Sequence, residues 1–107
     1  MARKTAETKK ENNFIEFEYT GKEFKYTGRV YPDLKKTAGK LDITPVNFTL
    51  NGVITIKGCR LMQTDNNAWL SGPQYKSGDE YKDFVYIERK FNDSEIAELV
   101  KVIESKL

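Results

Sequence analysis

The dipeptide Asn51-Gly52 limits how this 107-residue chain can fold more than any other feature. It separates two apolar-rich segments, residues 41–50 and 53–64, and both of its residues tolerate the positive φ angles that a tight hairpin turn requires. The two segments are therefore predicted to be neighbouring antiparallel strands.

Each of these strands changes its apolar phase near the middle. The apolar residues involved are Leu41, Ile43, Val46, Phe48 and Leu50 in the first strand and Ile54, Ile56, Cys59 and Leu61 in the second. A β-bulge at Pro45 and another at Lys57-Gly58 would return each set to one buried face. The second bulge would also turn Lys57 and Arg60 outward.

Four more segments have the alternation or the aromatic and β-branched content of strands. They are residues 14–20, 23–31, 68–76 and 81–88. Gly72-Pro73 interrupts the third of them, and residues 77–80 form a turn before the fourth. Residues 32–39 contain a proline, a glycine and two lysines and are predicted to be a mobile loop.

The chain ends in a predicted helix that carries an apolar stripe at helical spacing. The stripe consists of Ile96, Leu99, Val100, Ile103 and Leu107. Asn92 is placed to cap this helix, with Glu95 completing a capping box. We therefore expect an α+β fold, an antiparallel β-meander of about four to six strands followed by one C-terminal helix. Residues 14–107 would form this single domain, and residues 1–13 a disordered basic arm.

The residue inventory argues against an enzyme. There is no histidine, and the single cysteine, Cys59, has no base to activate it and is expected in the core. The same inventory predicts no metal and no cofactor. One cysteine excludes an intrachain disulfide, no apolar run is long enough to span a membrane, and the amino terminus lacks a signal-peptide core, so we expect a cytoplasmic protein with no membrane partner.

Basic and aromatic residues recur together in the second half of the chain. The candidate DNA-binding residues are Lys57, Arg60, Trp69, Tyr75, Lys76, Tyr81, Lys82, Tyr86 and Arg89. Flat rings can stack on bases while lysine and arginine neutralise phosphates, which is the chemistry that a nucleic-acid single strand requires. Lys82, Phe84 and Tyr86 would share a strand face opposite the one, with Val85 and Ile87, that the helix covers. A structural alternative stays open, with Trp69 as a core anchor and the tyrosines as a cross-strand pair of an ordinary hairpin.

A meander of four strands followed by a capped helix resembles the single-stranded DNA-binding fold of the positive-cofactor-four and whirly type, which occurs in small phage proteins. Residues 54–87 contain Ile-Lys-Gly-Cys-Arg-Leu-Met, Asn-Asn-Ala-Trp-Leu-Ser-Gly-Pro and Tyr-Lys-Ser-Gly-Asp-Glu-Tyr-Lys-Asp-Phe-Val-Tyr-Ile, and they also look similar to the SpoVG family of DNA-binding septation regulators. This similarity runs at most from Leu41 to the end of the chain. Gly72-Pro73-Gln74 departs from the Pro-Ser-basic run that the SpoVG pattern prefers.

These resemblances imply a non-catalytic homodimer or higher homo-oligomer that binds nucleic acid across strand surfaces. The residues that would contact phosphates are Lys57, Arg60, Lys76, Lys82 and Arg89, and those that would stack on bases are Trp69, Tyr75, Tyr81 and Tyr86. A dimer is also favoured because one helix of about four turns cannot cover so wide a sheet.

Three hypotheses for the function follow. The first is a sequence-tolerant single-stranded DNA-binding protein, with RNA left open as a ligand, that serves phage DNA replication or recombination in the host cytoplasm. The second is a SpoVG-like regulator that binds specific duplex sites. The third is a protein-interaction module whose sheet edge and aromatic residues bind a polypeptide and which has no affinity for nucleic acid.

Overall fold

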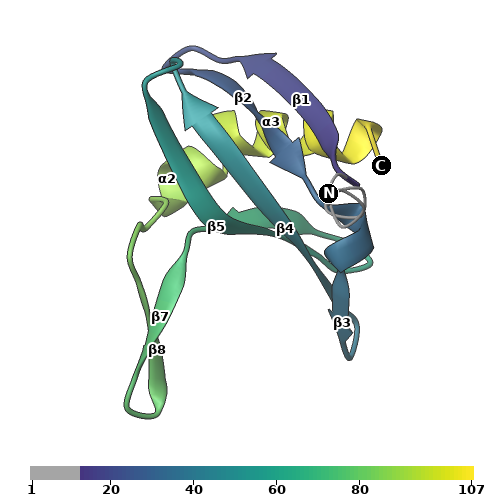
Figure 1. Ribbon diagram of the computed structural model, residues 1–107, viewed down its shortest axis with the longest axis vertical. Coiled ribbons are helices and arrows are strands. Elements are labelled where there is room, and N and C mark those ends of the chain that lie inside the picture. Colours follow the sequence, from purple (N-terminus) through teal and green to yellow (C-terminus); the bar gives the residue numbers. More distant parts are fainter. Residues whose placement is uncertain (1–12) are drawn as a thin grey trace, which may run out of the picture.

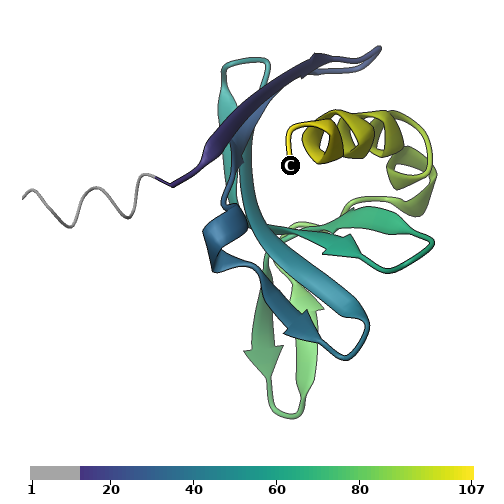
Figure 2. The ribbon, with the colours of Figure 1, turned by 90° about the vertical axis from the view of Figure 1, so that its right-hand side faces the viewer.

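A curved antiparallel sheet wraps around one helix in the computed structural model, which describes residues 13–107 (Figures 1 and 2). The main path of the sheet runs β1 (Ile15–Thr20), β2 (Lys25–Val30), β4 (Leu41–Leu50), β5 (Ile54–Gln63) and β6 (Ala68–Ser71), and β3 (Lys36–Ala38) pairs with the start of β4. The prediction of an α+β fold with about six antiparallel strands and a C-terminal helix is confirmed. The N-terminal segment that was predicted to be disordered, residues 1–13, lies outside the described residues except for Asn13.

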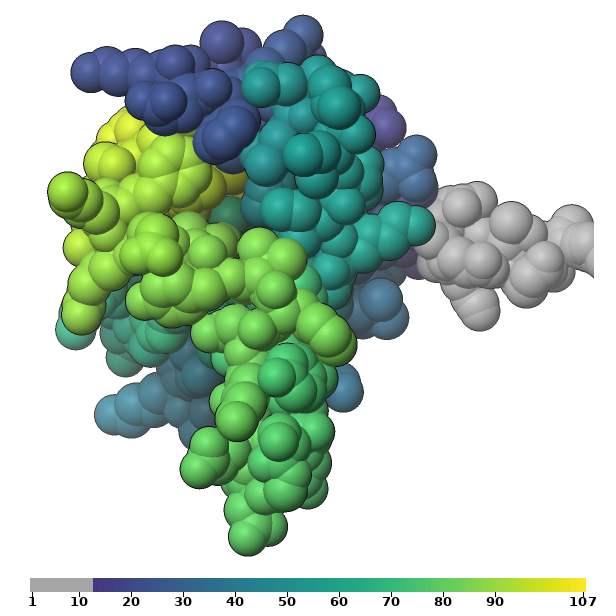
Figure 3. Space-filling model, turned by 90° about the vertical axis from the view of Figure 1, so that its left-hand side faces the viewer, coloured from purple at the N-terminus to yellow at the C-terminus, as the bar shows by residue number. Residues whose placement is uncertain are grey.

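The last hairpin does not belong to this sheet. Strands β7 (Gln74–Ser77) and β8 (Glu80–Asp83) form a separate two-stranded ribbon that projects from the body (Figures 1 and 3), which we call the arm. The prediction that residues 81–88 form a fourth strand of one meander is therefore wrong. Pro73 cannot donate a backbone hydrogen bond, and at the buried Gly72 a Cβ would collide with the Val85 carbonyl oxygen, so the chain changes direction where the returning segment crosses it.

Local turn and bulge signals are confirmed where the backbone requires positive φ. Asn51 and Gly52 have φ angles of 54° and 68° and join β4 to β5. The ladder between these strands shifts between Val46 and Phe48, which leaves Lys57 and Gly58 opposite Asn47. Gly58 has φ of 84°, and its N–H donates to Asn47 Oδ1 at 3.1 Å. The predicted bulge at Lys57-Gly58 is thus confirmed, and Lys57 is exposed as expected.

Two other sequence predictions for this hairpin are wrong. There is no bulge at Pro45 itself, because Thr44, Val46 and Phe48 are all buried in unbroken alternation. Leu41 and Ile43 lie on the opposite face and are half-buried. The bulge in β5 also fails to bury all four of its apolar residues, since Ile54 stays 58% exposed at the end of the sheet.

Residues 32–39 contain more structure than the predicted mobile loop. Pro32–Leu34 forms a short 3₁₀ helix, which a proline in its first turn favours. Strand β3 then pairs with β4, with Lys36 opposite Ile43 and Ala38 opposite Leu41.

The C-terminal segment forms two helices, α2 (Arg89–Asn92) and α3 (Glu95–Ser105). The predicted stripe packs on the concave face of the sheet: Ile96, Leu99, Val100 and Ile103 are all buried, whereas Leu107 is exposed. They join Phe17, Tyr26, Val30, Val46, Phe48, Cys59, Leu61 and Leu70 in one core. Among the described residues, no helix is long and apolar enough to cross a membrane.

The predicted capping box is wrong because both of its side chains bind elsewhere. Asn92 lies within α2, where its Nδ2 donates to the carbonyl of Leu70 at 2.9 Å. The carboxylate of Glu95, only 8% exposed, accepts hydrogen bonds from Glu23 N at 2.9 Å, Phe24 N at 3.1 Å and Tyr26 Oη at 2.7 Å. The N-terminus of α3 is thereby fixed to the turn between β1 and β2.

These contacts decide the charge of the Glu95 group. Burial by itself would raise the pKa of Glu95, but the hydrogen bonds from Glu23 N, Tyr26 Oη and Phe24 N hold that pKa below its ordinary value of 4.5. Burial and the same contact with Glu95 raise the pKa of Tyr26, whose hydroxyl therefore stays a donor.

Candidate nucleic-acid interface

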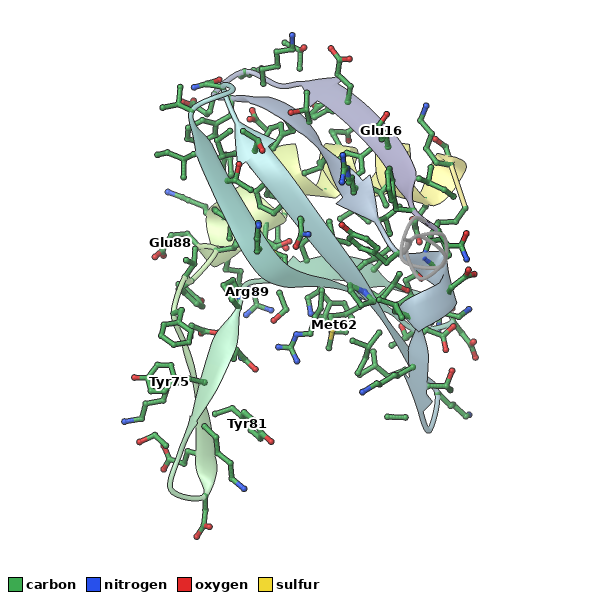
Figure 4. All side chains as sticks on the ribbon, viewed as in Figure 1. Glu16, Met62, Tyr75, Tyr81, Glu88 and Arg89 are labelled. Carbon is green, nitrogen blue, oxygen red and sulfur yellow. The ribbon has the colours of Figure 1, made fainter. Side chains whose placement is uncertain are left out.

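The arm places one tyrosine and one lysine side by side on each of its two faces. Tyr75 lies opposite Lys82 in the ladder, and Lys76 lies opposite Tyr81. Directly opposed residues share a face of a two-stranded ribbon, and neighbours along a strand alternate. Figure 4 accordingly shows Tyr75 and Tyr81 on opposite sides of the arm. Every residue of β7 and β8 is exposed, so both pairs are accessible.

The face with Tyr75 carries a second ring, Phe84, which was not among the candidate DNA-binding residues. Phe84 packs against Tyr75 with ring centroids 4.6 Å apart, and its N–H donates to the Pro73 carbonyl at 2.8 Å. This contact continues the returning chain along the arm beyond the last strand pair. It packs the two rings together while leaving Phe84 largely exposed.

A chain of polar contacts holds the base of the arm against the sheet. Arg60 Nη2 donates to Ser71 Oγ at 3.1 Å and to Gln74 Oε1 at 2.7 Å. Gln74 Nε2 then donates to Asp83 Oδ1 at 2.9 Å. Arg60 is half-buried and its Nη2 group is used within the molecule, so it positions the arm in addition to carrying charge.

Trp69 lies on the outer face of the sheet, the face away from α3. It is opposite Met62 in the ladder, and Met62 is opposite Ile43, so the three side chains form a row across β4, β5 and β6. Arg60 lies two residues before Met62 and shares this face. Lys57 lies farther along β5, in a hollow of about 680 Å³ that Arg29 and Asn47 also line. Lys57 is therefore the candidate residue that the fold separates from the arm.

A groove of about 760 Å³ follows β6 between the base of the arm and the two helices, and we call it the β6 groove. Three candidate residues line it: Trp69 from β6, Tyr86 from the chain that returns from the arm, and Arg89 from the first turn of α2. Gln74 and Asp83 line it as well. The fold thus brings together residues that are 20 positions apart in the sequence.

None of the four candidate rings is sealed in the core. Trp69 is 36% exposed, Tyr75 40%, Tyr81 68% and Tyr86 61%. Trp69 is absent from the buried cluster, so the alternative that it anchors the core does not fit. The exposed rings and the basic residues of the arm, the β6 groove and the outer face of the sheet make up the candidate interface, and Lys57 lies apart from the arm and the groove.

The candidate DNA-binding residues did not include Gln74, Asp83 or Phe84, although Phe84 was expected on the same strand face as Lys82. Counting outward from the turn at residues 77–80 would have placed Gln74 opposite Asp83, because a hairpin's register follows from its turn. Nothing local to the sequence indicates the contact between Phe84 and Tyr75, since it depends on the chain leaving the ladder after Asp83.

The described residues provide neither a reactive thiol nor a cluster of metal ligands. Cys59 is buried in the core, and burial raises the pKa of its thiol to about 12, so the thiolate is disfavoured at neutral pH. Within residues 13–107 there is no group of three or more cysteine and acidic side chains arranged to hold a metal ion.

Comparison with known proteins gives no assignment: no protein-family model matches the chain, no curated protein matches it, and no solved structure matches its fold. The likeness to the positive-cofactor-four, whirly and SpoVG types therefore remains a prediction from the sequence.

Proposed function

We propose that this protein is a non-catalytic, sequence-tolerant single-stranded DNA-binding protein. The observation that carries the proposal is the pairing of an exposed tyrosine with a lysine on each face of the arm, Tyr75 with Lys82 and Tyr81 with Lys76. A ring offers a stacking surface to any base, and the adjacent ammonium group lies where it can neutralise the phosphate beside that base.

The proposed strand passes around the arm, so that it meets both tyrosine–lysine pairs, and continues from the Tyr81 face into the β6 groove. Tyr81 and Lys76 share the face that also carries Gln74 and Asp83, and these two residues line the groove together with Trp69, Tyr86 and Arg89. Stacking contributes on the order of 1–3 kcal/mol per base. Two or three rings and a few phosphate contacts then give useful affinity, provided that a long strand or a second subunit shares the entropic cost of association.

The test is a titration of labelled single-stranded and duplex oligonucleotides at several salt concentrations. We expect preference for the single strand and an affinity that falls with salt, by about 0.7 in log K per log salt for each neutralised phosphate. Replacing Lys76 and Lys82 by alanine should lower this slope by about 1.4. The matched control replaces Lys22 and Lys101, which are exposed on the β1–β2 turn and on α3, and should leave the slope close to that of the unchanged protein.

Two outcomes of this titration would overturn the proposal. Salt-insensitive binding would mean that phosphates are not the contacts. Absence of binding would favour the protein-interaction module, and so would binding of a polypeptide that survives replacement of Lys57, Arg60 and Lys82.

A SpoVG-like regulator of specific duplex sites is the second candidate, and the projection of the arm favours it. A two-stranded β-ribbon fits the major groove of duplex DNA, and the exposed side chains of the arm would face base edges there. This candidate predicts strong discrimination between duplex sequences in the same titration. Uniform affinity for all duplexes would exclude it.

We also propose that the protein acts as a homodimer. The supporting feature is an apolar groove of about 400 Å³ lined by Phe24, Leu50, Ile56 and Val85, next to the exposed Ile54. Contiguous apolar surface of this kind marks interaction sites on many proteins. Light scattering after chromatography measures the mass directly, and Ile54→Glu should convert a dimer to a monomer without unfolding it. A role in phage DNA replication or recombination is part of the same proposal, and it depends on the single-strand preference.

A further inference from the structure

We infer that the β6 groove selects a base that carries an exocyclic amino group, cytosine over thymine, and this inference rests on the proposed single-stranded DNA binding. The groove lies at the base of the arm, where the proposed strand leaves the Tyr81 face. Its volume of about 760 Å³ is sufficient for a nucleotide. Trp69 and Tyr86 supply two aromatic walls, so an unstacked base finds apolar surface there.

Besides the guanidinium of Arg89, the groove offers hydrogen-bond acceptors to a ligand. Asp83 Oδ1 is occupied by Gln74 Nε2 at 2.9 Å, and among residues 13–107 no hydrogen bond reaches Asp83 Oδ2. Asn92 uses its Nδ2 to bind the Leu70 carbonyl, which leaves its amide oxygen as the group available to a ligand. Asp93 adds a second carboxylate. A base that donates a hydrogen bond therefore finds acceptors in the groove.

The same carboxylates decide which part of a nucleotide enters. A phosphate beside Asp83 and Asp93 would meet two like charges, an unfavourable arrangement. Arg89, whose Nε lies 3.9 Å from Asp93 Oδ2, is already close to one of these acids. The phosphates must then follow the lysines of the arm, and the base must face the groove.

Base chemistry then sets the preference. Cytosine presents an N4 amino donor, and a carboxylate is the side chain that accepts from it, whereas thymine presents the O4 carbonyl at the same place. Thymine O4 would face Asp83 Oδ2 with two acceptors in contact. The groove therefore favours cytosine among bases of equal ring size.

The experiment compares oligo(dC) with oligo(dT) of equal length by fluorescence anisotropy at one salt concentration. We expect oligo(dC) to bind about tenfold more tightly than oligo(dT), which lies in the lower part of the range of discrimination that a specific base contact provides. Asp83→Asn should remove the preference for cytosine. Gln74 Nε2 would bind the new amide oxygen, so the amide NH₂ would face the groove and donate a hydrogen bond to thymine O4. The ratio of the affinity for oligo(dC) to that for oligo(dT) should fall to one or below.

Asp79→Asn is the matched control, because it removes the same charge at the exposed tip of the arm. It should leave the ratio of the two affinities unchanged, even if both affinities rise. Equal binding of the two oligonucleotides by the unchanged protein would overturn this inference alone. Failure to bind either would overturn the proposed function with it. A lysine-rich peptide that binds in an Asp83-dependent way, while neither oligonucleotide does, would assign the groove to a polypeptide instead.

Discussion

Replacing Glu95 by glutamine tests whether a buried carboxylate organises the fold. Its Oε1 accepts from Glu23 N, and its Oε2 accepts from both Phe24 N and Tyr26 Oη. Glutamine keeps one acceptor oxygen and puts an NH₂ group where the other oxygen was. The orientation that keeps the oxygen at the Oε2 position preserves the bonds from Phe24 N and Tyr26 Oη, and it sets the NH₂ group against Glu23 N, a part-buried donor that then loses its acceptor.

The magnitude follows from these contacts. An orphaned buried donor costs about 1–3 kcal/mol, and the bonds that remain lose their charge assistance, so we expect the free energy of unfolding to fall by about 2–4 kcal/mol. A domain of this size has about 5–15 kcal/mol in total. The midpoint of thermal unfolding should drop by roughly 10–20 °C.

Urea and thermal unfolding followed by circular dichroism give the measurement. The matched control is Glu98→Gln on the same helix, where the carboxylate is exposed and its contact is Lys101 Nζ at 3.3 Å. Exposed pairs at this spacing contribute only about 0.3–0.5 kcal/mol. If the two variants lose equal stability, the Glu95 network does not hold α3 to the β1–β2 turn and the reasoning is refuted.

The pKa of Glu95 gives this prediction a pH dependence. Because the folded-state pKa lies below 4.5, the stabilisation is fully present above 4.5 and is lost as the pH falls through the lower folded value. The stability of Glu95→Gln should therefore depend less on pH in the acidic range than that of the unchanged protein. Parallel pH profiles for both proteins would contradict a titration at Glu95.

Three further predictions concern single positions. Gly21→Ala should destabilise strongly in urea unfolding, because a Cβ there would collide with the Glu95 carboxylate; a change below about 0.5 kcal/mol, the size of an ordinary surface substitution, would show that the turn can move aside. Gly58→Ala should cost about 1–2 kcal/mol by the same measurement, since its φ of 84° is unfavourable for a residue with a Cβ, and no loss would show that the bulge relaxes. Cys59 should react with a thiol reagent only as fast as the protein opens, because the thiol is buried and its pKa is raised to about 12; rapid labelling of the folded protein would contradict its place in the core.

Local patterns in the sequence determined the parts of this protein that depend on neighbouring residues. Asn51-Gly52 specified a hairpin and Gly58 a bulge, because positive φ is a property of single positions. Helical spacing identified the buried stripe from Ile96 to Ile103, because periodicity states which face of an element is apolar. Cys59 was placed in the core on the same grounds.

Tertiary structure alone decided which surfaces those elements meet. Alternation in residues 81–88 was compatible with a strand but could not say whether a partner strand was within reach, and the arm leaves the sheet instead. Glu95 matched a capping box by spacing, yet its partners lie 69 to 72 residues earlier in the chain. The exposure of Trp69 and the meeting of Tyr86, Arg89 and Asp83 around one groove arise in the same way. Sequence periodicity fixes the direction of a side chain relative to its own element. The neighbours of that side chain depend on how distant elements pack, and this packing is determined by interactions throughout the chain.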